Sequence, residues 1–159
     1  MKTTTYTYTT IDLPGGGFAQ SINSKGDVVG FYQVGPVEHG FLYSGGNVTT
    51  IDSPGSLDTV ALGINDKGLI IGQYEDTSGK HGFLDSGGIY TTIDPPGSHG
   101  AQPEAINAKG DVIGFYLDGN GVDHGFLYDH GNYTTIDFPG ALDTYPLGIT
   151  TRERYGGST

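Results

Sequence analysis

The sequence predicts an all-β fold: a β-propeller of four-stranded antiparallel blades, with three complete blades plus one composite blade from the two termini. T-T-I-D tetrapeptides end at Asp12, Asp52, Asp94 and Asp137, at intervals of 40, 42 and 43 residues. Each repeat contains four short apolar-rich segments that are separated by turns. Repeats of this length, each made of four strands, are typical of propellers.

The second repeat illustrates how each element is assigned. Segments 60–65, 69–74, 81–85 and 89–94 are the expected strands, and D-K-G and S-G-G supply tight turns with glycine at positive φ. Short loops between neighbouring strands predict an antiparallel meander. Pro-Gly follows each T-T-I-D and cannot continue a ladder, so the chain should pass there to the next sheet.

Glycines also recur inside the expected second strands, at Gly30, Gly72 and Gly114. A missing side chain in a strand lets another backbone approach closely. We expect these three positions to admit the adjacent sheet.

The 159 residues amount to a single repeat domain. Complete blades are expected over 18–52, 60–94 and 101–137. Residues 6–12 form an orphan outer strand and residues 145–156 a partial blade, which together would remove the two exposed edges. A monomer would then have four blades and a head-to-tail dimer eight. Because the composite blade is short of at least one strand, we favour a homodimer that completes the propeller.

The formal net charge of −11 argues against nucleic acid and anionic membrane as partners, and it permits neutral or cationic ligands such as sugars. No apolar run approaches about 18 residues, which predicts no membrane insertion. Cysteine is absent, so disulfides and thiolate metal sites are excluded. The first residues, M-K-T-T-T, lack the apolar stretch of a signal peptide.

The patterns I-N-x-K-G-D-V-V-G-F-Y, H-G-F-L-Y-S-G-G and Y-T-T-I-D-x-P-G together resemble the bacterial extracellular repeats of the HAF family, named for a His-Ala-Phe triplet. Here the triplet is His-Gly-Phe, and the likeness covers roughly residues 6–149. The resemblance implies a propeller-like repeat protein located outside the cell or in the periplasm. It implies no general activity and no cofactor.

Three sets of polar residues recur once in each repeat. Histidines open the third strands, and we expect them to stabilise each blade by bonding a neighbouring backbone carbonyl. Because they stand on separate blades, they lie too far apart for one tetrahedral metal site, so no metal is expected. The T-T-I-D aspartates are expected to cap the following turn, and the asparagines to form turns before glycine. The histidines and asparagines are His39, His81, His124, Asn23, Asn65 and Asn107.

Tyrosines end several expected strands. A tyrosine ring offers a flat apolar face with a hydroxyl group, which suits stacking on a sugar, and the chain has no tryptophan. Packing between blades is the alternative role. The candidate ligand-binding residues are Tyr32, Tyr74, Tyr116, Tyr43 and Tyr128.

Residues that break the repeat are the candidates for catalysis, because an active site needs asymmetry. His99 and His130 occur in the third repeat alone, and Arg152 lies in the diverged tail. A histidine base with an arginine that neutralises a carboxylate would suit β-elimination from a uronic-acid polymer. The loop 118–123 has alternating oxygen ligands but lacks the closing Glu of a calcium loop, so a plain hairpin loop is expected.

The sequence therefore leads to a non-enzymatic binding module for carbohydrate or another cell-surface ligand, with repeated sites between blades. The alternative is a carbohydrate-active enzyme, a polysaccharide lyase or glycoside hydrolase, with one site built from the symmetry-breaking residues. A third interpretation is an assembly protein without a small ligand. No cofactor is expected under any of the three.

Overall fold

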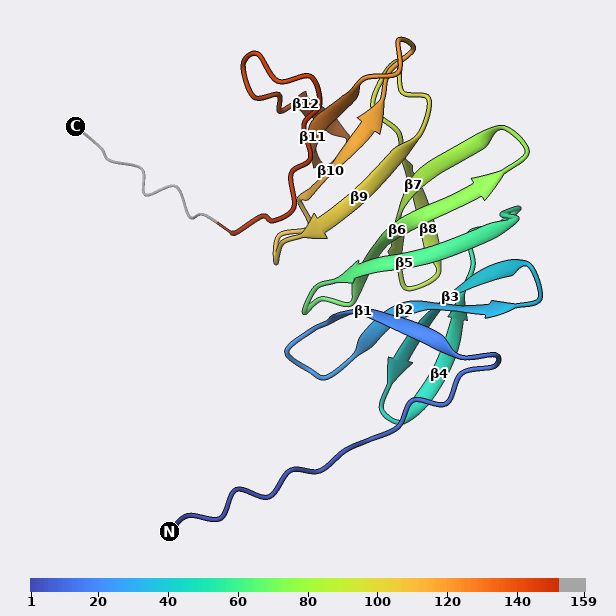
Figure 1. Ribbon diagram of the computed structural model, residues 1–159, viewed down its shortest axis with the longest axis vertical. Helices are drawn as coiled ribbons and strands as arrows, with labels where there is room; N and C mark the ends of the chain where they lie inside the picture. The colour runs from blue at the N-terminus through green and yellow to red at the C-terminus, as the bar shows by residue number, and fades with distance from the viewer. Residues whose placement is uncertain (152–159) are drawn as a thin grey trace.

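The computed structural model describes residues 1–151 and contains three four-stranded antiparallel sheets (Figure 1). Sheet I consists of β1 (Gly17–Ile22), β2 (Val28–Val34), β3 (Val37–Ser44) and β4 (Asn47–Ile51). Sheet II consists of β5 (Asp58–Ile64), β6 (Leu69–Asp76), β7 (Gly79–Ser86) and β8 (Ile89–Ile93). Sheet III consists of β9 (Ala101–Ile106), β10 (Val112–Leu117), β11 (Asp123–Asp129) and β12 (Asn132–Thr135).

The all-β prediction and the meander prediction are both confirmed. In every sheet the strands lie side by side in chain order, and all pairs are antiparallel. The sheets follow one another along the long axis of the molecule (Figure 1). The first strand of sheet II, β5, packs against sheet I, and the first strand of sheet III, β9, packs against sheet II. Within the described residues 1–151 there is no helix that could cross a membrane. Circular closure into a propeller stays a prediction.

The H-G-F triplet is explained by how one sheet packs on the next. Its phenylalanines, Phe41, Phe83 and Phe126, are fully buried. Its glycine is required by close approach, since a Cβ on Gly82 would lie 2.8 Å from Cδ of Pro103 in sheet III. The apolar core consequently lies between sheets: one buried cluster joins sheets I and II, and a second joins sheets II and III.

The glycines inside the second strands serve a different purpose from the one expected. A Cβ on Gly72 would overlap the carbonyl oxygen of Val60 and the ring of Phe83, both within the same sheet. The register of β5 against β6 shifts between Ala61 and Gly63, and the other two sheets shift at the equivalent place. These glycines therefore accommodate a β-bulge of the first strand and the core phenylalanine, not the adjacent sheet.

The expected composite blade is not formed by the two ends of this chain. Residues 6–12 are in no strand, and neither are residues 145–151; residues 152–156 lie outside the described part. The N-terminal segment has no neighbouring strand to pair with, so it forms no ladder. The N-terminal segment extends away from sheet I (Figure 1).

Candidate functional site

Each sheet holds a histidine–aspartate pair between its third strand and the end of its T-T-I-D segment. The Nδ1 to Oδ2 distances are 2.8 Å for His39–Asp52 and 2.6 Å for His81–Asp94. Because a carboxylate only accepts, Nδ1 of each ring carries the proton. The histidines thus bond an aspartate side chain instead of the backbone carbonyl we expected, and the aspartates bind histidine in addition to preceding a turn.

The same pairing recurs in sheet III, where His124 Nδ1 lies 2.7 Å from Asp137 Oδ2. Asp118, from the β10–β11 loop, approaches the opposite nitrogen at 3.3 Å. The hydrogen bonds that His124 donates to Asp137 and Asp118 raise the pKa of His124 above its usual value. The ring is therefore held between two carboxylates, which favour its protonated form.

In sheet II, Ser78 links His81 to a second carboxylate. The Ser78 hydroxyl donates to Asp76 at 2.6 Å and lies 2.9 Å from His81 Nε2. With its only proton committed to Asp76, that hydroxyl can accept from a protonated Nε2. Burial pulls the pKa of His81 down, but the bonds to Asp94 and Asp76 outweigh burial and raise it.

The second-strand tyrosines cover these histidines. The ring centroids of Tyr74 and His81 lie 5.2 Å apart, and the Tyr74 hydroxyl lies 3.2 Å from the hydroxyl of Thr92. Tyr32 and Tyr116 stack on their histidines in the same way. These contacts give Tyr32, Tyr74 and Tyr116 a place in the packing of each sheet.

The two third-strand tyrosines differ in their surroundings. Tyr128 is buried in the cluster between sheets II and III, with its ring centroid 5.2 Å from that of Tyr133. Tyr43 occupies the same position in sheet I and is half-buried. The sequence could not distinguish a packed tyrosine from an exposed one, because both uses need the same amphipathic ring.

Asparagines connect successive sheets. Asn65 Oδ1 accepts from the backbone of its own turn, at Lys67 N and Leu69 N, as expected for a turn former. Its Nδ2 then donates 3.0 Å to the carbonyl oxygen of Asn107 in sheet III. Asn23 likewise donates to the carbonyl oxygen of Asn65, so one hydrogen-bond ladder runs through all three sheets.

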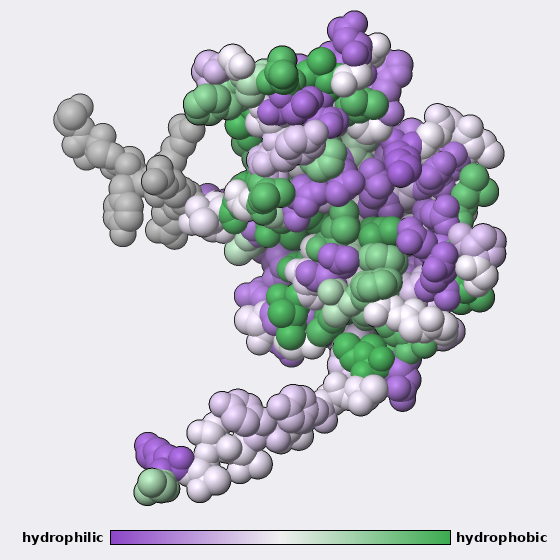
Figure 2. Space-filling view, viewed as in Figure 1, coloured by the Kyte–Doolittle hydropathy of each residue, from purple (hydrophilic) through white to green (hydrophobic). Residues whose placement is uncertain are grey.

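Among the grooves at the other end of the strands, two lie at equivalent places, one between each pair of neighbouring sheets. The groove between sheets II and III measures about 260 Å³, and the groove between sheets I and II about 60 Å³. Figure 2 shows hydrophilic residues gathered over this end, where β6 ends and β7 begins. The larger groove is lined by Gln73, Lys80, His99, Gly100, Gln102, Phe115, Leu117 and Asp123, among others.

The two grooves are built from equivalent positions of the repeat. Glu38, Asp58, Val60, Gln73 and Glu75 line the smaller groove. One repeat later the same positions carry Lys80, Gly100, Gln102, Phe115 and Leu117, which line the larger one. The larger volume follows in part from glycine standing where the first groove has an aspartate. A groove thus recurs at both sheet junctions, but the two linings differ.

The three residues considered for catalysis are not assembled into one site. His99 is exposed in the larger groove, and its backbone N–H donates to Leu117 O at the end of β10. His130 lies beyond the opposite end of that strand, 3.9 Å from Asp111. A strand of six residues is roughly 20 Å long, so no single substrate bond reaches both rings. Arg152 lies outside the described residues.

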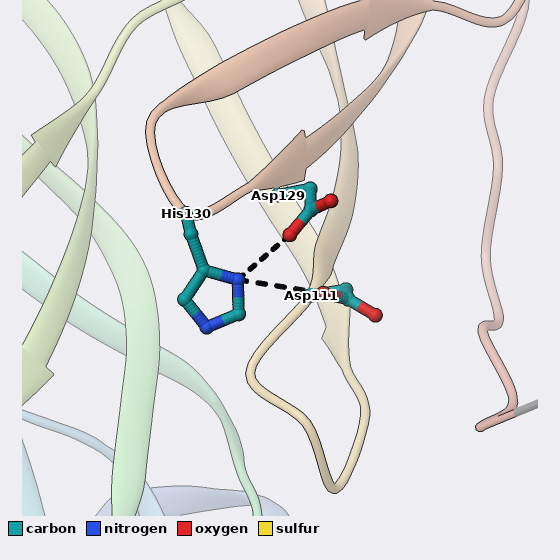
Figure 3. A group of neighbouring side chains, drawn as sticks. All are labelled: Asp111, Asp129 and His130. Carbon is teal, nitrogen blue, oxygen red and sulfur yellow. Dashed lines mark hydrogen bonds and ion pairs between the residues drawn. The ribbon is translucent and has the colours of Figure 1, made fainter.

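His130 belongs to a separate exposed cluster with Asp129 and Asp111 (Figure 3). Its Nδ1 lies 2.7 Å from Asp129 Oδ1, and its φ of 48° lies in the left-handed region where the other two repeats have glycine. The donor atoms of the three residues lie within 4.8 Å of one another, a spacing that could hold a metal ion. A protonated His130 would balance the negative charge of the two aspartates without a metal ion. The prediction of no metal stays a prediction.

The loop 118–123 is closed by its own aspartate. Asp118 Oδ1 accepts from the backbone of Asn120 and of Val122 at 2.8 and 2.9 Å. These bonds lower the pKa of Asp118 to about 2. The carboxylate is therefore occupied in shaping the hairpin, which agrees with a plain connecting loop.

Neither a family model, nor a curated protein, nor a solved structure matches this chain. The resemblance to HAF repeats and the extracellular or periplasmic location therefore stay predictions. The groove residues Gln73, Gln102 and Phe115 were missed by sequence reasoning. The available signal was the position of Gln73 and Phe115 next to the second-strand tyrosines Tyr74 and Tyr116 in the chain.

Proposed function

We propose that the chain is a non-enzymatic binding module for neutral oligosaccharides, with its sites in the two grooves between sheets. The observation that carries the proposal is the recurrence of a polar groove at equivalent positions of both sheet junctions. A ligand with repeating units can occupy such sites together, and individually weak sites then gain from multivalency.

The lining of the larger groove suits a sugar ring. Gln73 and Gln102 are half-buried, and each amide nitrogen already donates one bond, from Gln73 to Ala101 O at 3.2 Å and from Gln102 to Glu104 Oε1 at 2.6 Å. One N–H and the amide oxygen of each side chain are left to donate to and accept from vicinal hydroxyls. Phe115 is half-buried beside them and adds aromatic surface to the groove, with the Tyr145 ring packed on it at a centroid distance of 4.9 Å. Lys80 and Asp123 add one charge of each sign, so the groove attracts no strongly charged ligand.

A propeller arrangement is supported by how the C-terminal segment lies on sheet III. Asp123 N donates to Asp143 at 3.1 Å, just as Glu38 N donates to Asp58 of β5 at 2.8 Å. Residues 143–151 therefore follow the path of the first strand of a further sheet.

The outer face of sheet I, on the side of β1, is not covered by another segment of residues 1–151. Ile22 is 66% exposed, whereas its counterpart Ile64 in β5 is 7% exposed against sheet I. Phe18, at 64%, is also exposed on β1. We infer that another sheet belongs on this face, and a second copy that completes the propeller supplies one.

Isothermal titration calorimetry with soluble neutral oligosaccharides of glucose, mannose and galactose tests the binding proposal. Phe115→Ala should weaken binding about 10-fold, equivalent to about 1.4 kcal/mol. Ile89→Ala is the control, because Ile89 is 73% exposed on β8 and lines neither groove. Equal affinity for the wild type and Phe115→Ala would contradict the groove assignment, and the absence of binding to the whole panel would contradict the function.

A further inference from the structure

A third pocket lies between sheets I and II, at the opposite end of β6 and β7 from the grooves. It measures about 290 Å³ and is lined by Leu42, Thr49, Thr50, Ile51, Gly68, Ile70, Asp85, Gly87, Gly88 and Tyr90. Because a cavity of about 150 Å³ holds benzene, this volume accommodates an aromatic ring with a short side chain. The exposed Thr49 and Thr50 lie at its rim.

The pocket exists because the repeat is broken at one position. Asp85 stands where sheet III has Tyr128 and sheet I has Tyr43. Between sheets II and III the Tyr128 ring fills the equivalent space and packs on Tyr133. Between sheets I and II the shorter aspartate leaves that space open beside Tyr90.

Asp85 is only 2% exposed, yet its carboxylate is half satisfied. One oxygen, Oδ1, accepts from Gly88 N at 2.6 Å, and no residue within 1–151 donates to Oδ2. Burial raises the pKa of Asp85. Neither lysine nor arginine lines the pocket, so the negative charge has no counter-ion from its walls.

The other walls are apolar or aromatic. Leu42, Ile51 and Ile70 form the sides, with Tyr90 across from them. Burial, followed by the nearby Asp85 and Asp52, raises the pKa of Tyr90 to about 12, so its ring is neutral and can also face a cation. A buried, uncompensated carboxylate surrounded by apolar walls is complementary to a compact organic cation.

We propose that the Asp85 pocket is a binding site for a primary ammonium ion carried on a small apolar or aromatic body. The ammonium group donates to Asp85 Oδ2, and the body fills the space that tyrosine occupies at the other sheet junction. This site is separate from the oligosaccharide grooves, since it shares no residue with either.

Calorimetry with phenethylamine as the probe tests the proposal, with 2-phenylethanol as its neutral isostere. The amine should bind once per chain with a Kd of about 1 mM or tighter, and the alcohol at least about 10-fold more weakly. Asp85→Asn should remove most of the preference for the amine. Asp85→Tyr, which restores the repeat, should abolish binding of both compounds by filling the pocket.

Three outcomes would overturn the proposal. They are no binding of the amine to the wild type, equal affinities for amine and alcohol, and unchanged amine affinity in Asp85→Asn. Asp85→Asn keeps the size of the side chain, so it remains informative if Asp85→Tyr fails to fold. Oligosaccharide binding by Asp85→Asn reports on the grooves separately, because failure there leaves the amine result intact.

Discussion

Replacing Asn65 with alanine tests the connection between sheets most sharply. The asparagine is 6% exposed, and it makes two hydrogen bonds within its turn and one to Asn107 in sheet III. Each such bond contributes about 1 kcal/mol net, so the loss of all three should lower the free energy of unfolding by about 3 kcal/mol. For a domain of this size that corresponds to a fall in Tm of about 6–12 °C.

Thermal and urea unfolding followed by circular dichroism measure the change. Asn65→Asp separates the two roles, because it keeps the acceptor for Lys67 N and Leu69 N but cannot donate to Asn107. Asn65→Asp should still be less stable than the wild type, since its carboxylate faces the carbonyl oxygen of Asn107. Asn47→Ala, at an exposed turn, is the control and should change stability by less than about 0.5 kcal/mol. A change that small at Asn65 would refute the reasoning.

Three further predictions concern charge and close packing. His124 has a folded-state pKa above its unfolded value, so its contribution to stability is complete below about pH 6.5 and is lost as pH rises through the folded pKa. Urea titrations from pH 6 to 8 should show the loss. His124→Gln should reduce the slope and leave the part that comes from His81, whose pKa is also raised. Asp85 has a raised pKa, so its charged form destabilises the fold above that pKa. Asp85→Asn should therefore unfold at a higher temperature than the wild type at pH 7, and this difference in Tm should shrink toward pH 4. Gly82→Ala places a Cβ against Pro103 and should cost about 1–3 kcal/mol in chemical unfolding, whereas Gly148→Ala, with open space around it, should be nearly neutral; equal effects would contradict the packing described.

The architecture was readable from the sequence because the repeat imposes it. A period near 42 residues with glycine turns predicted the strands and their order, and the structure places Asn65 in its turn as expected. The sequence could not show how neighbouring repeats pack against one another. The role of Gly72 depends on a bulge in the same sheet, and bulges leave no pattern that differs from close approach by a neighbouring sheet.

The candidate sites were harder to predict for a physical reason. Tyrosine is amphipathic, so Tyr74 in a packed stack and a tyrosine on a binding surface have the same pattern. The pocket at Asp85 required knowing which face of sheet II meets sheet I. Comparing the third strands position by position shows that Asp85 departs from Tyr43 and Tyr128, and this is the signal that leads to the pocket.

Nuclear magnetic resonance titration of the wild type with a neutral oligosaccharide that binds in calorimetry tests the central claim most directly. The account predicts that the largest chemical-shift changes occur at Gln73, Gln102 and Phe115, in the groove between sheets II and III. Smaller changes should appear at Glu38 and Asp58 of the other groove. Changes concentrated on any other surface, with these residues unaffected, would contradict it.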